Sequence, residues 1–437
     1  MEPTVRRAAA FALVGTLALA APVVGAVAAV PFALIAVVGR LVSNGPLFDL
    51  LASSADRTAG QLRSLVRFSL AVTALLLLAS LTGLSTVAAV AAVLLLVYGD
   101  LAVSVVGTRG TGSLAEVVTF GGVGAVAAIV GLALVGVTTD AVVDPATVSF
   151  LAVTGVLVAA LLRQLLAEPE DPAIVVSVVA LLWVLAGLDL QVDPATFVLA
   201  LAVAGAFGYL SWLLGTASLS GMLTGVAIAL GTIVLGGFGW FAILIAFFGL
   251  GGLAAKYRYD TKLEYGVAEA NAGARTIRNV LGNAAVAVVA VVGYAASPSV
   301  GVAALLFAYV FAGSLSTAMA DTLSSELGVL YGPPRLITTL EPVEVGTDGG
   351  VSLAGVLAGL GGGTLVGLLA LGLLDGVTPA GAAVVVAAGV VGMFADSVLG
   401  ATLEGWLVGN QSVNFLSTLV GGLLAPALAI AVGALLL

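Results

Sequence analysis

Residues 85–106 read STVAAVAAVLLLVYGDLAVSVV, and Asp100 is the only charged residue among them. A helix needs about 20 mostly apolar residues to cross the hydrocarbon core of a bilayer, so this run is long enough to form one membrane span. The whole chain has the same character, since 61% of its 437 residues are hydrophobic and 8% are charged, with a mean hydropathy of +1.25. Soluble domains carry about 25% charged residues, so the composition excludes a soluble globular protein.

Fourteen further apolar runs, separated by charged residues, Pro or Gly clusters, have a similar composition. We therefore predict an all-α, polytopic integral membrane helical bundle with about 13 to 15 spans. The run from Ala8 to Gly39 is too long for one span and contains Pro22 and Pro31, so we divide it into a hairpin. Several runs are short, which leaves re-entrant pairs or single kinked helices as alternatives. The expected spans are residues 8–24, 25–39, 68–83, 85–106, 117–138, 147–166, 173–188, 195–214, 219–235, 237–254, 280–296, 300–320, 351–374, 379–395 and 415–437.

The basic residues predict the orientation of these spans. If the N-terminus is cytoplasmic, all 14 basic residues fall in the N-terminus, in the even-numbered loops or at adjoining span ends, as the positive-inside rule requires. We therefore predict a multi-pass cell-membrane protein with a cytoplasmic N-terminus and a cytoplasmic active face. The apolar opening has no break like a cleavage site, so we expect it to stay in the membrane. The net charge of −9 and the excess of Arg over Lys are typical of a salt-adapted proteome, so we expect a halophilic archaeal source.

The residue types limit the chemistry. The chain contains no Cys and no His, which excludes disulfides, thiol chemistry, His metal sites, haem ligation and Ser-His-Asp triads. Carboxylates, Arg, Lys, Ser, Thr, Asn and Tyr remain. No Walker P-loop is present, and the Gly-rich GTRGTGS (residues 107–113) lacks its Lys. The G-x-x-x-G spacing of Gly355 and Gly359 predicts close helix packing.

Three aspartates stand at or near the predicted cytoplasmic ends of spans. They are Asp100 in YGDLAVSVVG, Asp321 in MADTLSSELG and Asp396 in FADSVLGATLEG. A Ser follows both Asp100 and Asp321 four positions on, and a Gly follows seven positions on. These positions share one face of a helix, and Gly allows a backbone or a phosphate to approach closely. The alternative is that each Asp sits in headgroup water or caps a helix.

Two further acids add carboxylates on the same side, namely Glu326 after Asp321 and Glu404 after Asp396. Such a cluster suits a hard cation. Mg²⁺ is favoured because it binds proteins through one or two carboxylates plus substrate phosphates. The same carboxylates would equally suit a cation-coupled transporter.

Two predicted cytoplasmic loops supply complementary groups. Residues 255–284 contain five of the 14 basic residues, and Asn279 and Asn283 lie one helical turn apart there. Residues 330–352 contain Arg335 and a GTDGG turn just before a helix start. Backbone amides in such a turn can bind anions. Ordinary surface connectors with turn glycines and positive-inside Arg are the alternative.

Five segments of the C-terminal half resemble a known family in order and spacing. They are SGMLTGVAIALGTIVLGGFGWFAILIAFF, AGARTIRNVLGNA, AMADTLSSELG, GTDGGVSLAGVLAG and FADSVLGATLEG. They resemble the integral-membrane family that includes plant phytyl-phosphate kinase and the animal transmembrane protein 19, over about residues 216–437. The resemblance implies transfer of a phosphate from a nucleoside triphosphate, CTP in the best-known relatives, to an isoprenyl monophosphate.

The N-terminal half, residues 1–215, has a weaker resemblance. YGDLAVSVVGTRGTGSLAEVVTFGG is similar to the G-D-x-A-x-x-x-x-G-x-R…E…G element of phytol and dolichol kinases, without the Lys that precedes the Glu-bearing segment in that element. The resemblance makes Asp100, Arg109 and Glu116 candidates for a second site. Asp100 and Asp321 would then be copies of one ancestral motif in two related halves.

The leading hypothesis is a membrane kinase that converts phytyl or geranylgeranyl monophosphate to the diphosphate. Asp321, Glu326 and Asp396 would hold Mg²⁺ on the nucleotide phosphates, and Arg275 would complete the catalytic set. The prenyl tail would lie in a groove between spans, and we expect no nucleic-acid partner. The predicted nucleotide- and phosphate-binding residues are Arg278, Asn279, Asn283, Ser325, Arg335, Gly346, Thr347, Asp348, Gly349 and Gly350. The alternatives are a transporter or lipid flippase with acids near the bilayer midplane and a non-catalytic scaffold.

Overall fold

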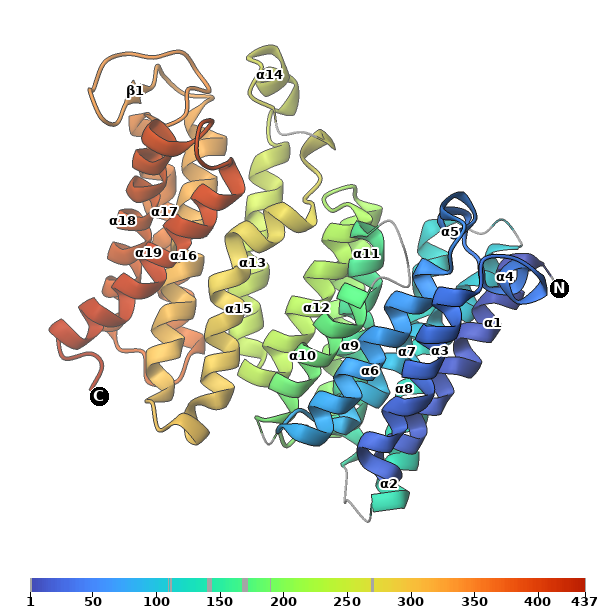
Figure 1. Cartoon of the computed structure of the whole chain (residues 1–437). Helices are drawn as coiled ribbons and strands as arrows, with labels where there is room; N and C mark the ends of the chain where they lie inside the picture. Colours follow the sequence, from blue (N-terminus) through green and yellow to red (C-terminus); the bar gives the residue numbers. More distant parts are fainter. Residues whose placement is uncertain are drawn as a thin grey trace. The chain divides into compact units, whose positions relative to one another are not determined.

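The computed structural model describes residues 2–108, 110, 112–139, 144–166, 172–188, 190–268 and 271–436. In these ranges the regular structure is helical except for one pair of two-residue strands, which confirms the predicted all-α class (Figure 1). The chain divides into two compact units, Met1–Val198 (unit 1) and Leu199–Leu437 (unit 2). The sequence-based division at residue 215 stays a prediction.

Unit 1 contains ten α-helices and two short 3₁₀ helices in the described ranges. They are α1 (Pro3–Thr16), η1 (Leu17–Ala20), α2 (Ala21–Val24), η2 (Gly25–Ala28), α3 (Ala29–Leu41), α4 (Pro46–Leu51), α5 (Ser54–Ala59), α6 (Arg63–Leu81), α7 (Thr86–Gly107), α8 (Ser113–Thr139), α9 (Pro145–Leu165) and α10 (Pro172–Ala186).

Unit 2 begins within α11, so most of this helix belongs to it. Its elements are α11 (Pro194–Leu213), α12 (Leu219–Gly236), α13 (Phe238–Lys256), α14 (Tyr259–Glu264), η3 (Asn271–Gly273), α15 (Ile277–Val300), α16 (Ala304–Gly328), β1 (Arg335–Leu336), β2 (Gly350–Val351), α17 (Leu353–Leu373), α18 (Pro379–Leu403) and α19 (Asn410–Ala431).

The apolar segment Pro3–Leu41 folds as the predicted hairpin. Gly25 adopts φ 58°, a left-handed conformation that glycine tolerates, and the helix is broken on both sides of it. Nε of Arg7, near the start of α1, donates a hydrogen bond to the carbonyl oxygen of Leu51, beyond the end of α3, at 2.9 Å. Helix α4, which follows α3, therefore lies beside α1, and α2 lies at the opposite end of the two arms (Figure 1).

Thirteen helical segments in the described ranges are long and apolar enough to cross a membrane. One of them is the 39-residue hairpin, which has two arms, and the 15-residue α10 is shorter than the rest. Each of the fifteen predicted runs thus corresponds to a helix or to a hairpin arm. The predicted range of spans is confirmed.

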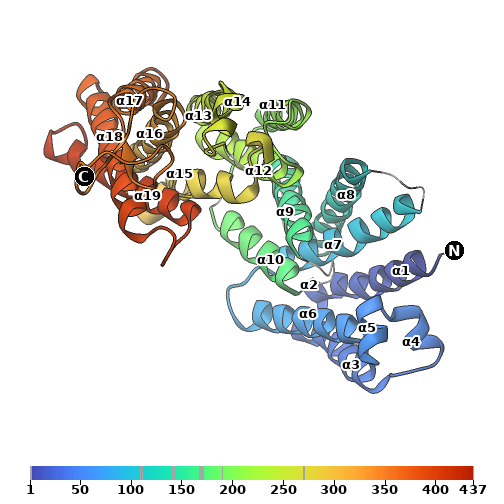
Figure 2. The ribbon, with the colours of Figure 1, turned by 90° about the horizontal axis from the view of Figure 1, so that it is seen from above.

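Helix α16 is the centre of unit 2, enclosed by α15, α17, α18 and α19 (Figure 2). Small residues permit this close packing. A Cβ atom added to Gly355 would stand 2.9 Å from the carbonyl oxygen of Ser324, and one on Gly359 would stand 2.8 Å from that of Ala320. The packing role predicted for this glycine pair is therefore confirmed.

The short elements α14, β1 and β2 lie at one end of unit 2, as Figure 1 shows for α14 and β1. Strands β1 and β2 pair antiparallel, with Arg335 opposite Val351 and Leu336 opposite Gly350. This pairing closes the loop between α16 and α17 over the C-terminal end of α16.

Candidate functional site

A polar cavity of about 190 Å³ lies between α16, α18 and the loop that joins α16 to α17. Among the described residues, its lining contains four carboxylates, several hydroxyl groups and one amide, and no Arg or Lys. An acidic cavity of this kind attracts cations. The polar lining residues are Asp321, Ser324, Ser325, Thr347, Asp348, Ser352, Asp396, Ser397, Glu404 and Asn410.

Asp321 and Asp396 form the inner part of this cavity. Each is the eighteenth residue of a helix of 25 residues, and their carboxyl groups lie within hydrogen-bonding reach of each other. Atom Oδ1 of Asp396 is buried and has no hydrogen-bond partner among the described residues. Two carboxylates this close repel each other unless a proton or a cation lies between them. The structure thus brings together two of the three predicted metal ligands.

The residues present fit a magnesium ion that is shared with a substrate. No group of three or more Asp or Glu side chains in the described ranges is arranged to hold a metal ion by itself. Mg²⁺ keeps several waters and binds through one or two carboxylates together with phosphate oxygens. The pair of Asp321 and Asp396, with one buried oxygen left without a partner, fits such an open arrangement.

The GTDGG turn, residues 346–350, forms one wall of the cavity. The backbone amide and hydroxyl of Thr347 both donate to the carbonyl oxygen of Glu344, at 3.2 and 2.8 Å. Gly349 has φ 75°, and a Cβ on it would stand 2.6 Å from the carbonyl oxygen of Ser397. Only glycine therefore allows this turn to lie directly on α18.

Glu404 and Asp348 carry the negative charge outward from the aspartate pair. Glu404 follows the last residue of α18, and Asp348 is exposed on the turn. Burial raises the pKa of Glu404 most, and the charges of Asp348 and Asp396 raise it further, against a hydrogen bond with Asn410. The carboxylates in the outer part of the cavity therefore repel one another.

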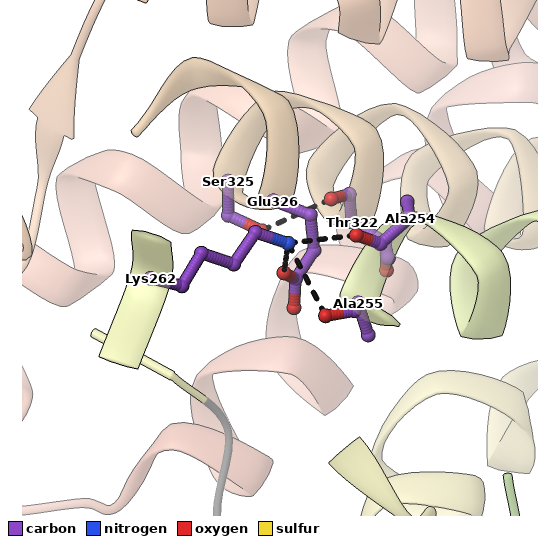
Figure 3. A network of polar contacts seen from close by, with 6 residues as sticks. All are labelled: Ala254, Ala255, Lys262, Thr322, Ser325 and Glu326. Carbon is purple, nitrogen blue, oxygen red and sulfur yellow. Dashed lines mark hydrogen bonds and ion pairs between the residues drawn. The ribbon is translucent and has the colours of Figure 1, made fainter. Parts of the chain in front are cut away.

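Glu326, the third predicted metal ligand, does not line the cavity. Instead, Nζ of Lys262 in α14 contacts its Oε2 at 2.6 Å, as Figure 3 shows. The same ammonium group donates to the carbonyl oxygens of Ala254 and Ala255 at 2.7 and 3.3 Å. Lys262 is only 1% exposed, and these three contacts use all of its donors. The metal role of Glu326 stays a prediction.

Sequence reasoning did not single out Lys262, because it treated this residue as one of several positive-inside cations. A signal was present, since Lys262 is one of only two lysines beside twelve arginines. A compact ammonium can meet three acceptors around one point, which a planar guanidinium does not do.

Arg275 is held next to the aspartate pair by its backbone. Its amide donates to the carbonyl oxygen of Thr216 at 2.8 Å, and its carbonyl oxygen accepts from the amide of Ser218 at 3.0 Å. Its guanidinium group and the methyl group of Thr322 both lie within 4 Å of where a Cβ on Gly251 would stand. Thr322 directly follows Asp321 in α16, so the guanidinium group of Arg275 lies near the aspartate pair.

Arg275 also lines a narrow apolar groove of about 80 Å³. The other walls come from α11, α12 and α13, with aromatic and aliphatic side chains that include Phe207, Met222, Phe241 and Phe248. The kinase hypothesis predicted a groove between spans for the prenyl tail, and Arg275 is the cationic residue among the described residues that line this groove.

The other predicted phosphate-binding residues lie away from the cavity lining. Oδ1 of Asn279 accepts hydrogen bonds from the amide and hydroxyl of the N-cap residue of α15, at 3.1 and 2.6 Å. Asn283 is buried and donates to the carbonyl oxygen of Asn279 at 3.0 Å. Arg278 is exposed, and exposed Arg335 donates to a carbonyl oxygen of its own loop at 2.8 Å. Their binding roles stay predictions.

The second candidate site falls in unit 1. Asp100 forms an ion pair with Arg163 of α9 at 2.6 Å, and the guanidinium carbon of Arg163 lies 4.6 Å from the ring centre of Phe120. Glu116 lies on α8 and does not line the cavity that contains Asp100. Arg109 lies outside the described residues.

Comparison with known proteins finds membrane proteins that are similar to part of this chain. "Uncharacterized membrane protein MJ0933" of Methanocaldococcus jannaschii is 35% identical over 190 residues, which are 43% of this chain and 75% of that protein. "Uncharacterized membrane protein sll0875" of Synechocystis is 34% identical over 211 residues, 46% of this chain and 79% of its own length. "Protein VTE6, chloroplastic" of Arabidopsis thaliana is 35% identical over 214 residues, 46% of this chain and 63% of its own length.

No solved structure matches the chain. Residues 202–422 match the family described as "Integral membrane protein DUF92". This range contains the aspartate pair, Lys262, Arg275 and the GTDGG turn, and it covers just over half of the chain. The protein therefore belongs to the DUF92 family of integral membrane proteins.

Proposed function

We propose that unit 2 is a membrane prenyl-phosphate kinase that transfers the γ-phosphate of a nucleoside triphosphate, CTP, to phytyl or geranylgeranyl monophosphate. The observation that carries the proposal is the pair of Asp321 and Asp396 in an acidic cavity, next to an arginine that also lines an apolar groove. The resemblance of the surrounding motifs to the family of plant phytyl-phosphate kinase supports it.

The cavity is the proposed nucleotide side. Asp321 and Asp396 would hold Mg²⁺, which supplies charge neutralisation on the nucleotide phosphates when bound. An acidic lining without Arg or Lys would repel a bare triphosphate, so the proposal requires the metal for nucleotide binding. The turn at residues 346–350, packed against α18, would limit how deeply the phosphates enter.

The groove is the proposed acceptor side. An isoprenyl chain is apolar, so the walls of Phe207, Phe241 and Phe248 would contact the part of it next to the phosphate, because a groove of about 80 Å³ is too small to enclose the whole chain. Arg275 would bind the acceptor phosphate and orient one of its oxygens toward the γ-phosphorus. That oxygen forms the new P–O bond while the bond from the γ-phosphorus to the β–γ bridging oxygen breaks, and the nucleoside diphosphate leaves. No strong general base is needed because the acceptor phosphate is already an anion near pH 7.

The depth of the acids favours this function over a cation-relay transporter. Asp321 and Asp396 are each seven residues from the C-terminal end of their helices, or about 10 Å at 1.5 Å per residue. A relay across the bilayer needs ionisable groups that reach its middle. The other Asp, Glu, Lys and Arg residues in the long described helices of unit 2 are Lys256, Arg278 and Glu326, and each lies within two residues of a helix end.

Phosphate transfer by purified full-length protein tests the proposal. The assay supplies radiolabelled nucleoside triphosphate, Mg²⁺ and geranylgeranyl monophosphate, and it compares all four nucleotides. We expect Asp321→Asn and Asp396→Asn to lower kcat at least about 100-fold, as loss of a preorganised electrostatic contact does. Asp375→Asn is the matched control, because Asp375 is exposed in the loop between α17 and α18. Full activity of Asp321→Asn would refute the assignment.

A further inference from the structure

Unit 1 contains a cavity of about 620 Å³, outside the range that matches the family. It is lined by residues of α1, α4, α5, α6, α7 and α9. A volume of this size is typical of sites for small molecules, which span about 300–1,000 Å³. The charged residues that line it are Arg7, Asp49, Arg57, Asp100 and Arg163.

These charges leave the cavity cationic, in contrast to the acidic cavity of unit 2. Arg163 pairs with Asp100 at 2.6 Å, with side chains only 17% and 14% exposed. Arg57 pairs with Asp49 at 3.5 Å in a much more exposed position. Among the residues that the structure describes, three guanidinium groups and two carboxylates give the lining a formal charge of +1.

The arrangement of Arg163 indicates a place for an acceptor. Its Nε is buried and has no hydrogen-bond partner among the described residues, and a buried donor without an acceptor is costly. The hydroxyl groups of Ser54 and Ser104 line the same cavity. An oxyanion would therefore meet both charge and hydrogen-bond donors.

Apart from Thr4 and Ser53, the rest of the described lining is apolar. Phe11 and Phe68 contact each other with ring centres 5.7 Å apart, and Leu96 and Val97 of α7 continue this wall toward Asp100. A cavity with cationic and hydroxyl groups beside an apolar wall suits a ligand that has an anionic head and an apolar body.

We propose that this cavity binds the phosphate monoester head of a lipid. Guanidinium groups bind phosphate in a bidentate manner, and the apolar wall would contact the first part of the lipid chain. The site is independent of the kinase proposed for unit 2. A free phosphate ion has the same head chemistry but would leave most of the volume unfilled.

Equilibrium binding to the purified full-length protein in detergent, without nucleotide, tests this site. The probes are radiolabelled geranylgeranyl monophosphate, inorganic phosphate and the neutral alcohol geranylgeraniol. All variants carry Arg275→Gln in addition, so that binding by the cation of the unit 2 groove does not contribute.

Two substitutions should act in opposite directions. Asp100→Asn raises the formal charge of the lining to +2 and releases Arg163 from its ion pair, so we expect the Kd for geranylgeranyl monophosphate to fall roughly tenfold. Arg7→Gln removes the excess charge, so we expect the Kd to rise roughly tenfold. A simple folding defect would weaken binding in both variants.

Opposite shifts of the Kd support the proposal. Inorganic phosphate that binds as tightly as the lipid phosphate would overturn the lipid assignment and identify a free anion as the ligand. The proposal is also overturned if both substitutions leave the Kd unchanged or move it the same way, or if geranylgeraniol binds as tightly as its monophosphate.

Discussion

The buried ion pair of Lys262 and Glu326 gives the sharpest prediction for stability. At 2.6 Å, two unit charges attract by about 6 kcal/mol at an effective dielectric constant near 20, and desolvation offsets much of this. Lys262→Met keeps the aliphatic stem and removes the charge. It leaves the carboxylate of Glu326 only 11% exposed without its cation, and breaking a buried pair in this way costs about 3–5 kcal/mol.

Thermal unfolding of the full-length protein in detergent measures this loss. For domains of roughly 150–250 residues, 1 kcal/mol corresponds to about 2–4 °C. We therefore expect Lys262→Met to lower the Tm of unit 2 by roughly 6–20 °C. Lys256→Met is the matched control. The ammonium group of Lys256 donates to the carbonyl oxygen of Leu214 at 2.9 Å, in an exposed position. We expect that variant to lose less than about 1 kcal/mol.

A double variant separates loss of the charge from loss of packing. Lys262→Met combined with Glu326→Met removes both charges, and apolar replacement of a whole buried pair is often neutral. We expect the double variant to recover most of the Tm lost by Lys262→Met. The reasoning is refuted if Lys262→Met is as stable as the wild type, or if the double variant is no more stable than Lys262→Met alone.

Two further predictions concern the cavity walls. Gly349→Ala places a methyl group against α18 and should lower kcat/KM up to about 100-fold by shifting the turn. The control is Gly405→Ala, at φ 82° in open space, which should leave kcat/KM unchanged. Equal losses in the two variants would contradict this prediction. The pKa of Glu404 is raised in the folded protein above its ordinary 4.5, so the folded protein binds this proton more tightly than the unfolded chain does. The free energy of unfolding therefore falls as pH rises from 4.5 through the raised pKa. Glu404→Gln should therefore have a higher Tm than the wild type at neutral pH and the same Tm well below pH 4.5; parallel Tm profiles would contradict this.

The spans were predictable because the bilayer imposes a length and a composition on every helix that crosses it. The N-terminal hairpin followed from the same rule, since the apolar run from Ala8 to Gly39 is longer than one crossing and contains Pro22 and Pro31. The pairing of Asp321 with Asp396 did not follow, because a hydropathy pattern gives the depth of a residue and not its neighbours across helices. Sequence reasoning placed both acids at one face, and packing around α16 brought them into contact.

The loop residues were predicted less well than the spans. Asn279 was assigned to phosphate, yet its side chain caps α15 through the backbone of Thr276, and the spacing of three residues between them is typical of capping. The burial of Lys262 depends on α14 folding back onto the end of α13 and onto α16. No local pattern in the loop encodes that contact.

The central position of α16 explains how a polar site is built into so apolar a chain. About 67% of the residues in its apolar 18-residue stretch are buried inside the protein, against 33% for α17 and 39% for α18. Ser314 and Thr317 are fully buried there and donate to carbonyl oxygens of α16 itself, at 2.9 and 3.0 Å, so their hydroxyl groups are satisfied without contact with lipid. Because neighbouring helices surround α16, the wall of the cavity at Asp321 is formed by protein, with Asp396 of α18 beside it. The glycines of α17 permit that enclosure, so substitutions there should disturb the aspartate pair without touching it.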